Sequence, residues 1–269
     1  MFARRIVNII LPPLANFPPF RPLRPRAVRE FSLPLRDGAR TPRMRPMNDF
    51  EVIDFALTPS LMSVYMRELR DTSVQTDSMR FRTNLRRIGQ IMAYEISRRL
   101  TYRDVPTPTP LGTATCQMPA EDMVVATILR AGLPFHEGFL DYFDGAGNAF
   151  VSAYRRYREK NADEFDVVVE YLASPSIEGK TLLLVDPMLA TGTSMELGYK
   201  ALLTKGQPKH VNVASVIASQ AGVDYVCSRF PAETTTLWVG AIDPEINAHS
   251  YIVPGLGDAG DLAYGPKDS

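Results

Sequence analysis

The chain has few of the residues that mark metal, redox or membrane proteins. Its 269 residues include two cysteines, Cys116 and Cys227, and three histidines, His136, His210 and His249. Neither set has the spacing of a metal or redox site, so both cysteines are expected to be free thiols in a reducing compartment. No apolar run approaches the roughly 18 residues needed to cross a bilayer. We therefore expect a cytoplasmic protein with no membrane partner.

A formal net charge of zero conceals an uneven distribution of charge. Residues 1–46 carry ten arginines, nine prolines and two acids, whereas the remaining 223 residues carry 20 basic and 28 acidic side chains. Proline disrupts helical and sheet hydrogen bonding, so residues 1–46 are expected to be a disordered basic extension of a domain formed by residues 47–269. The acidic domain lacks the basic footprint of a nucleic-acid-binding protein. The extension itself could be a translated upstream stretch with Met47 as the true start, a basic interaction arm or a transit peptide.

Apolar runs alternate with helical patterns along the domain. Strands are expected at Met123–Leu129, Ala149–Ala153, Thr181–Val185, Val211–Ile217 and Leu237–Ile242. Helices are expected at Pro59–Arg70, Ser78–Leu100, Pro134–Phe143, Met195–Leu203 and Gln220–Arg229. Residues 101–117 are expected to form a loop or a short edge ribbon, and residues 167–172 one arm of a projecting hairpin. This alternation predicts an α/β fold, a Rossmann-like parallel sheet of about five strands flanked by helices on both faces.

One segment carries the strongest chemical signal. The apolar run Thr181–Val185 ends in Asp186, and a loop of small and hydroxyl residues follows before a helical pattern begins. Such a loop at the carboxyl end of a parallel strand lies where open α/β sheets bind ligands. Its backbone N–H groups and the positive end of the next helix favour an anion. The segment therefore predicts a phosphate site with an acid beside it, and it lacks the Gly-Lys-Ser/Thr of a Walker loop.

Asp186-Pro187-Met188-Leu189-Ala190-Thr191-Gly192-Thr193-Ser194 resembles the diphosphate-sugar signature of the type I phosphoribosyltransferases. These enzymes bind 5-phosphoribosyl diphosphate (PRPP), and most of them carry two acids at the end of this strand. Pro187 in place of the second acid resembles the uracil phosphoribosyltransferase branch. The resemblance implies a type I phosphoribosyltransferase fold, with a small hood formed by N- and C-terminal segments.

A second motif near the C-terminus supports the same resemblance. Residues 251–261 contain three glycines in the sequence Tyr-Ile-Val-Pro-Gly-Leu-Gly-Asp-Ala-Gly-Asp. A glycine-rich loop exposes main-chain donors and acceptors, which can match the two carbonyls and the N–H along the edge of uracil. The resemblance, which runs from about Asp71 to Gly265, implies that uracil is bound by Ile252, Gly257, Asp258 and Ala259.

Two arginines follow predicted strands at the ligand edge of the sheet. Arg130 comes after Ile128-Leu129, and Arg155 follows the run that ends at Ala153. A guanidinium can donate two parallel hydrogen bonds to a diphosphate. The neighbours Arg156 and Arg158 leave open that Arg155 belongs to a solvated basic face. The resemblance assigns PRPP binding to Arg130, Arg155, Asp186, Pro187, Met188, Leu189, Ala190, Thr191, Gly192, Thr193, Ser194 and Asp258, and it implies a non-proline cis peptide in the loop near Arg130.

The resemblance implies transfer of the phosphoribosyl group of PRPP to N1 of uracil, which gives UMP and diphosphate in pyrimidine salvage. Asp186 is expected to position the ribose, and residues 190–194 the 5′-phosphate. Mg²⁺ is expected to be held mainly by PRPP, without dedicated protein ligands. No general base is identifiable. A homo-oligomer, either a dimer or a tetramer, is expected. GTP is an effector in some members of the family, and no feature of this sequence indicates a site for it.

Two positions depart from the family pattern. Thr193 replaces a glycine that is usual in the phosphate loop, and Leu262 replaces a residue that is commonly basic. Phosphate binding should survive the first change if the φ angle of Thr193 is negative, because threonine keeps its N–H. The second change is expected to affect salt-bridge support of the loop more than the base contacts.

Two alternative functions remain open on the sequence. A phosphoribosyltransferase for another base, such as a purine, would share the phosphate loop but not the base loop. An RNA-binding regulator of pyrimidine genes built on the same fold would need a basic surface, which the acidic domain lacks.

Overall fold

The computed structural model describes residues 43–47, 50–158 and 161–266, with backbone alone for 43–47, 153–158 and 161–169. Most of the predicted extension, residues 1–42, therefore lies outside the described residues. The last residues of the predicted extension have regular structure. Strand β1 (Arg43–Met47) pairs antiparallel with β2 (Phe50–Asp54), so regular structure begins before residue 47.

A mostly parallel sheet forms the centre of the domain, as predicted. Its spatial order is β1-β2-β11-β10-β8-β5-β6-β7, and every neighbouring pair from β2 to β6 is parallel. The strands not yet given are β5 (Met123–Ile128), β6 (Gly147–Arg158), β7 (Asn161–Ala173), β8 (Thr181–Val185), β10 (His210–Ser219) and β11 (Thr235–Asp243).

The five predicted strands are present, and β2 is a sixth parallel strand that the prediction missed. Its sequence Phe-Glu-Val-Ile-Asp places acids among apolar residues, so it lacks an unbroken apolar run. The structure satisfies these acids locally. Glu51 accepts a hydrogen bond from Thr236 of β11, and Asp54 accepts one from the backbone N–H of Ala56.

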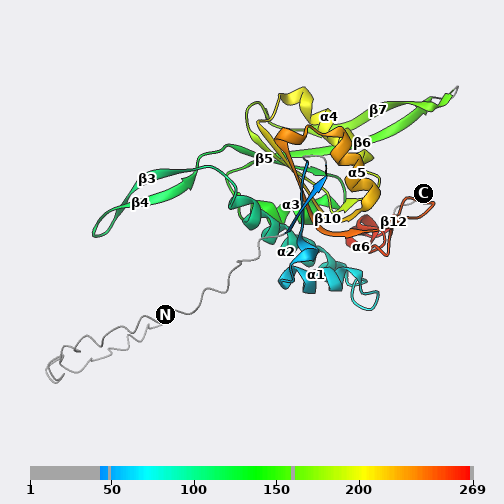
Figure 1. Ribbon diagram of the computed structural model, residues 1–269, viewed down its shortest axis with the longest axis horizontal. Helices are drawn as coiled ribbons and strands as arrows, with labels where there is room; N and C mark the ends of the chain where they lie inside the picture. Colours follow the sequence, from blue (N-terminus) through cyan, green and yellow to red (C-terminus); the bar gives the residue numbers. More distant parts are fainter. Residues whose placement is uncertain (1–42, 48–49, 159–160, 267–269) are drawn as a thin grey trace, which may run out of the picture. The chain divides into compact units, whose positions relative to one another are not determined.

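Helices cover both faces of the sheet because its strands alternate between two apolar clusters. Leu182 and Leu184 of β8 belong to one cluster, and Leu183 and Val185 belong to the other. The first cluster is covered by α4 (Thr193–Leu202) and α5 (Gln220–Arg229). The second is covered by α1 (Leu61–Arg70), α2 (Ser78–Ser97) and α3 (Gly132–Leu140), as Figure 1 shows. A parallel sheet buried on both faces explains why its strands are apolar throughout.

The strand order creates a switch point between β5 and β8. After β5 the chain passes through α3 to β6 on one side, whereas β8 leads through α4 to β10 on the other. At such a point the loops that leave the carboxyl ends of the two strands diverge and open a crevice, which is where open α/β sheets bind ligands. Arg130 follows β5 and Asp186 follows β8, so the fold brings these two predicted site residues to one edge.

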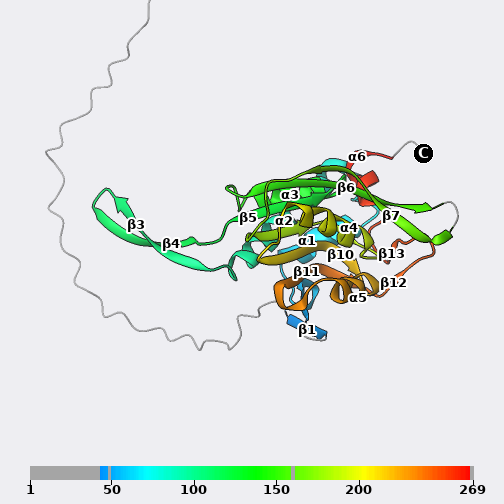
Figure 2. The same cartoon turned by 90° about the horizontal axis from the view of Figure 1, so that it is seen from above.

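A long hairpin replaces the predicted loop or ribbon at residues 101–117. Strands β3 (Tyr102–Thr109) and β4 (Gly112–Pro119) pair antiparallel, and Figure 2 shows them extending away from the central sheet. Almost all of their side chains are exposed, including Leu111 at the tip. The hairpin register continues without a break from residue 102 to residue 119. At one edge of the central sheet, β7 pairs antiparallel with β6, in agreement with the predicted hairpin arm at residues 167–172.

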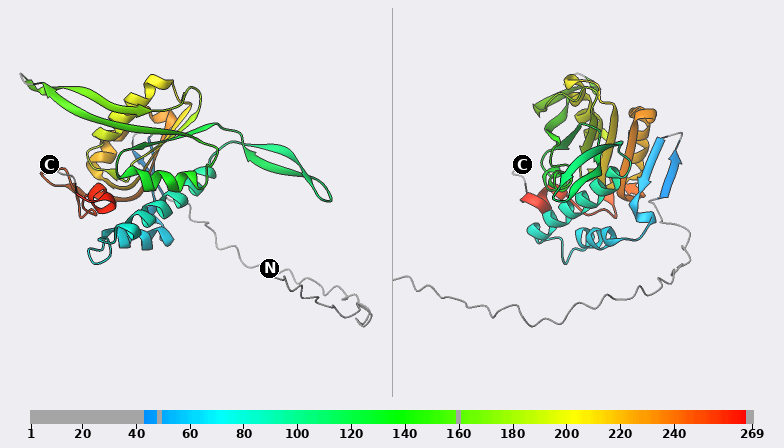
Figure 3. Two further views of the ribbon diagram at one scale, coloured as in Figure 1. Left: turned by 180° about the vertical axis from the view of Figure 1, so that it is seen from behind. Right: turned by 90° about the vertical axis from the view of Figure 1, so that its left-hand side faces the viewer.

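The C-terminal segment is built from short elements. They are the strands β12 (Glu245–Ile246) and β13 (Ile252–Val253), which pair with each other, and the helix α6 (Ala259–Tyr264). Figure 3 shows α6 beside the N-terminal helices, and Arg82 of α2 donates a hydrogen bond of 2.5 Å to the carbonyl of Ala263. The N- and C-terminal segments thus form the predicted hood.

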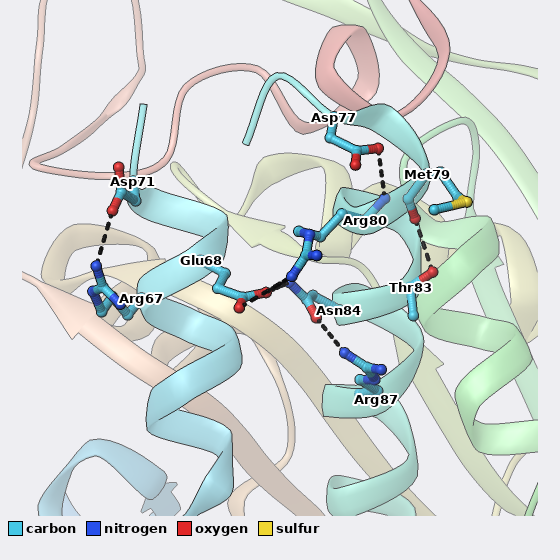
Figure 4. Close-up of polar contacts among 9 residues, drawn as sticks. All are labelled: Arg67, Glu68, Asp71, Asp77, Met79, Arg80, Thr83, Asn84 and Arg87. Atoms are coloured by element: carbon cyan, nitrogen blue, oxygen red, sulfur yellow. Dashed lines mark hydrogen bonds and ion pairs between the residues drawn. The ribbon is translucent and has the colours of Figure 1, made fainter. Parts of the chain in front are cut away.

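Polar contacts join the two helices of the hood. Glu68 of α1 accepts a hydrogen bond of 2.7 Å from Asn84 of α2 and a longer bond from Arg80 (Figure 4). The hydrogen bond from Asn84 lowers the pKa of Glu68. Asp77 caps the N-terminus of α2 by accepting from the N–H of Arg80, which satisfies a donor that the helix itself leaves free. These contacts fix the end of α1 that faces the C-terminal segment.

The helices give no sign of a membrane span. Within the described ranges, none combines the length and apolarity that a bilayer crossing requires.

Candidate active site

The loop after β5 carries Arg130. The Leu129–Arg130 peptide is cis, as the resemblance implies, and α3 begins two residues later at Gly132. The Arg130 Nη2 atom lies 3.0 Å from Asp261 Oδ1, and Nη1 donates to the carbonyl of Gly265 at 3.4 Å. The guanidinium is therefore held by the C-terminal segment, at the edge of the sheet where the crevice opens.

The loop after β8 leads through a very short strand, β9 (Met188–Leu189), to α4. Gly192 has a φ of 79° and stands immediately before the first helical residue, Thr193. A side chain is strained at such a φ, which explains the glycine at this position. Thr193 itself begins α4, so its φ is helical and negative. Phosphate binding is expected to survive the glycine-to-threonine departure if this φ angle is negative, and it is. The loop still has backbone N–H groups at the positive end of a ten-residue helix.

Asp186 lies at the entrance of this loop. Burial raises the pKa of Asp186 to about 7, and the hydrogen bond from the N–H of Met188 acts in the opposite direction. Among the described residues no cation pairs with this carboxyl, which is half-buried in the wall of the cleft. Such a group can donate or accept a hydrogen bond near neutral pH, which suits contact with a sugar hydroxyl.

The glycine-rich C-terminal loop is held by side chains from distant parts of the chain. Arg70 at the end of α1 makes two hydrogen bonds of 2.7 Å to Asp243 at the end of β11, and it also donates to the carbonyl of Gly255. Asp243 accepts from the N–H of Gly255 at 2.8 Å. Gln75 donates to the carbonyls of Leu69 and Leu256. Hydrogen bonds from these side chains thus hold the main chain of the loop at Gly255 and Leu256.

The loop places Asp258 at the start of α6. Its side chain accepts from the N–H of Asp261 at 2.9 Å, which is an N-cap. Gly255 and Gly257 have φ values of 63° and 87°, so both require the conformational freedom of glycine. Leu262, the second departure from the family pattern, is partly buried and packs against the core cluster on the α2 face.

A cleft of about 420 Å³ brings the three loops together. Its lining includes seven of the predicted residues, namely Arg130, Asp186, Met188, Ala190, Ser194, Asp258 and Ala259. A hollow of about 520 Å³ between α1 and β11 contains none of the predicted residues. We therefore take the smaller cleft, which combines a cation, carboxylates and a helix N-terminus, as the candidate active site.

Other predicted residues do not line the cleft. Pro187 and Leu189 are buried, and the side chain of Leu189 packs in the core, so these two residues could contact a ligand only through their backbone. The rest of this group is Thr191, Gly192, Thr193, Ile252 and Gly257. Arg155 lies within β6 rather than after it, because the strand continues to Arg158, and its side chain lies outside the described residues.

The cleft lining also contains residues that the sequence reasoning did not assign to the site. Ile128, Leu129, Ala131 and Gly260 are close neighbours of predicted residues, whereas His249, Ser250 and Tyr251 come from a separate turn. They belong to the turn between β12 and β13. The side chain of Asn247 accepts hydrogen bonds from the N–H groups of His249 and Tyr251, at 2.9 and 3.0 Å, and Ser250 has a φ of 62°. Asparagine favours such a turn because its side chain accepts from the backbone N–H two residues further on, although the sequence alone does not show that the turn faces the site.

The cleft offers oxygen donors but no preformed metal cage. Across the described residues, no group of three His, Cys, Asp or Glu side chains is arranged to hold a metal ion. The carboxylates of Asp186 and Asp258 line the cleft, and carboxylates are the kind of ligand that Mg²⁺ prefers. This donor set fits an ion that is bound mainly through its substrate.

Comparison with known proteins identifies the family of this chain. The uracil phosphoribosyltransferase family model matches residues 57–266. A protein named uracil phosphoribosyltransferase from Porphyromonas gingivalis is 58% identical over 217 residues, which cover 81% of this chain and 99% of the relative. One of the same name from Metallosphaera sedula is 35% identical, over 78% of this chain and 99% of the relative. The solved structure of the AQ2163 protein from Aquifex aeolicus superposes with a TM-score of 0.69 at 28% identity, over 80% of this chain and 98% of that one.

The match of the family model spans most of the domain, including all three loops of the cleft, and the relatives align over nearly their whole length. The chain belongs to the uracil phosphoribosyltransferase family.

Proposed function

We propose that this protein transfers the 5-phosphoribosyl group of PRPP to N1 of uracil, giving UMP and diphosphate. The observation that carries the proposal is the single cleft into which the fold brings Arg130, Asp186 and Asp258 from three separate loops. The loop after β5 would contact the diphosphate, the loop after β8 the ribose and 5′-phosphate, and the C-terminal loop uracil. Membership of the family favours this reaction over transfer to a purine or RNA-binding regulation.

The chemistry follows from the charges that the reaction develops. As the bond between C1 of the ribose and the diphosphate breaks, the ribose becomes positive and the leaving group becomes more negative. Groups that are already oriented toward this charge stabilise the transition state without reorganising. Arg130 is the cation of the cleft for this role, and Arg155 is a second one by family resemblance. Mg²⁺, held mainly by PRPP, would supply further positive charge to the diphosphate.

The loop before α4 would hold the 5′-phosphate. Residues 190–194 surround the N-terminus of α4, where backbone N–H groups have no partner within the helix. Ala190 and Ser194 line the cleft, and so does Asp186, which precedes them at the start of the same loop. The Asp186 carboxyl would hydrogen-bond a ribose hydroxyl and thereby set the position of C1 relative to the base. Positioning of this kind can supply much of the rate enhancement of a two-substrate reaction.

The C-terminal loop would hold uracil through its main chain. Ile252, Gly257 and Ala259 supply backbone groups, and the ties from Arg70 and Gln75 fix the backbone of the same loop. The Asp258 side chain caps α6, and its carboxylate lies on the cleft where it would approach PRPP or the bound ion. Since the groups that read the base are backbone atoms, specificity depends on the conformation of the loop more than on its side chains.

Three further properties belong to this proposal, together with one test. The enzyme would use Mg²⁺, act in the cytoplasm and form a homo-oligomer, and its activity would be tested for dependence on GTP. None of the residues described here is assigned to a GTP site.

The test is a steady-state assay with uracil, PRPP and Mg²⁺, with and without GTP. Formation of UMP from uracil, and not of AMP or GMP from the purine bases, is the expected result. A purified, folded protein that forms AMP or GMP faster than UMP would overturn the assignment of the base. A metal chelator should abolish turnover and excess Mg²⁺ should restore it.

A further inference from the structure

Asp261 occupies a place that joins two of the three loops of the cleft. Its backbone N–H donates to the side chain of Asp258 at 2.9 Å, and its own carboxylate lies 3.0 Å from Nη2 of Arg130. One residue in the first turn of α6 therefore contacts both Asp258 of the base loop and Arg130, the residue proposed to face the diphosphate.

Arg130 depends on this turn for its position. Its hydrogen-bond partners among the described residues are Asp261 and the carbonyl of Gly265. The guanidinium also lies against the backbone of Gly260, since a Cβ atom placed on that glycine would be 3.4 Å from Nη2. All these contacts come from residues 260–265. An arginine side chain that is not held in this way retains many rotamers, and ordering it costs conformational entropy.

We propose that Asp261 is a positioning residue, which fixes the Arg130 guanidinium for the diphosphate of PRPP and makes its placement depend on the base loop. This inference rests on the proposed function and adds a residue that neither the motif nor the cleft lining assigns. It also gives the base loop a second role, because a loop ordered around uracil orders α6, and α6 orders Arg130.

An acid beside Arg130 could instead compete with the diphosphate for it. The geometry favours positioning. A guanidinium has five N–H donors, and Asp261 and Gly265 engage only two of them, one on each terminal nitrogen. The ion pair is also partly open to solvent, with side-chain exposures of 36% for Arg130 and 42% for Asp261. Solvent and salt screen the charge of Asp261, so the acid removes little of the cation's attraction for the diphosphate, while its hydrogen bond still fixes the direction of Nη2.

The test is a double-mutant cycle on the full-length enzyme, using Asp261→Ala, Arg130→Ala and the combination. Asp261→Ala keeps the backbone N–H that meets Asp258, and Asp261→Asn serves as a second variant of nearly the same shape. Glu137→Gln is the control, since Glu137 is an exposed acid on α3 that is absent from the cleft lining. The measurements are kcat/KM for PRPP, the PRPP dissociation constant with and without uracil, and the thermal midpoint.

Asp261→Ala should lower kcat/KM for PRPP about tenfold in the otherwise unchanged enzyme and less than about twofold in the Arg130→Ala background. It should also remove any tightening of PRPP binding by uracil, because that coupling would run through the same contact. An equal loss in both backgrounds would show that Asp261 acts only through the stability of α6. Unchanged or tighter PRPP binding in Asp261→Ala would equally overturn the proposal.

Failure of the proposed function would look different. In that case the unaltered enzyme and Glu137→Gln would not convert uracil to UMP. PRPP binding measured by calorimetry would still report whether Asp261 positions Arg130.

Discussion

The two sides of the cleft are built in different ways. The phosphate side, residues 128–132 and 186–194, consists of short segments that connect adjacent parallel strands to the helices that follow them. The base side, residues 243–265, has little regular structure of its own and is held by Arg70, Gln75 and Arg82 from the N-terminal helices. The phosphate side is thus fixed by the sheet, and the base side by side chains more than 170 positions away in the sequence.

This difference has a functional meaning. A site for diphosphate and phosphate can be assembled from strand ends and a helix N-terminus, which many α/β sheets provide. A site that reads one base needs a backbone in one particular conformation. The chain obtains that conformation by tying the carbonyl and N–H groups of Gly255 and Leu256 to buried or half-buried polar side chains. Mutations on the two sides should therefore affect different kinetic constants.

The largest expected effect is on the phosphate side. Arg130→Ala should reduce kcat/KM about 30- to 1,000-fold, because a charge-assisted contact to the leaving group contributes about 2–4 kcal/mol in the transition state. The fold should persist, since the side chain is partly exposed. The measurement is steady-state kinetics together with circular dichroism, and near-normal activity in a folded variant would contradict the assignment.

Arg70→Ala tests the hydrogen bonds from Arg70 to Asp243 and Gly255, which hold the base side. The change leaves the buried Asp243 without its guanidinium partner, which should cost about 2–3 kcal/mol of unfolding free energy. The KM for uracil should rise more than the KM for PRPP, because Gly255 loses its fixed position. Arg67→Ala on the same helix is the control. Its ion pair with Asp71 is exposed, so it should cost less than about 0.5 kcal/mol. Equal effects of the two substitutions would break the comparison.

A pH experiment examines Asp186, the half-buried acid of the phosphate side. The pKa of Asp186 is raised to about 7 from an ordinary 3.8, so the folded protein binds this proton more tightly than the unfolded chain. Its contribution to stability therefore falls as the pH rises from about 4 to about 7, where the ionised carboxyl becomes costly. Asp186→Asn should be more stable than the unaltered protein at pH 8 by about 2 kcal/mol. The difference should shrink toward pH 4, as measured by urea unfolding, and a constant difference would refute the burial of a titrating carboxyl here.

The smallest expected effect comes from loss of the Gln75 hydrogen bonds, which also hold the base side. Gln75→Ala removes two hydrogen bonds to the carbonyls of Leu69 and Leu256 and should cost about 1 kcal/mol. The KM for uracil should rise a few-fold, with the KM for PRPP unchanged. Thr83→Ala is a suitable control, because Thr83 bonds only within an exposed part of α2. A rise in the KM for PRPP instead would mean that the tie serves the phosphate side.

The same difference explains which parts of the molecule the sequence could predict. The five core strands are local apolar runs, and the loops after β5 and β8 follow from strand-end composition, so Arg130 and Asp186 were predicted at one edge. Strand β2 was missed because its acids interrupt the apolar pattern. The hairpin at residues 102–119 was predicted only as a loop or a short edge ribbon, because prolines within it mask the strand signal.

Hydrogen bonds between residues far apart in the sequence leave no pattern in the local sequence. Nothing in the sequence around Arg70 or Gln75 indicates a partner in the C-terminal loop, and Asp261 was passed over although it lies within the recognised motif. His249 and Ser250 entered the cleft through a turn set by Asn247, whose orientation only the structure shows. Arg155 was expected just after a strand, whereas β6 extends beyond it, so its proposed role rests on family resemblance.

The central claim is that the main chain of the base side reads uracil. The most direct measurement compares uracil, 5-fluorouracil and cytosine as substrates at saturating PRPP. Cytosine exchanges an acceptor for a donor at position 4 and a donor for an acceptor at N3, and each mismatched buried group costs about 1–3 kcal/mol. Uracil and 5-fluorouracil should therefore react at similar rates and cytosine at least several hundredfold more slowly. Comparable rates for cytosine and uracil would contradict the account.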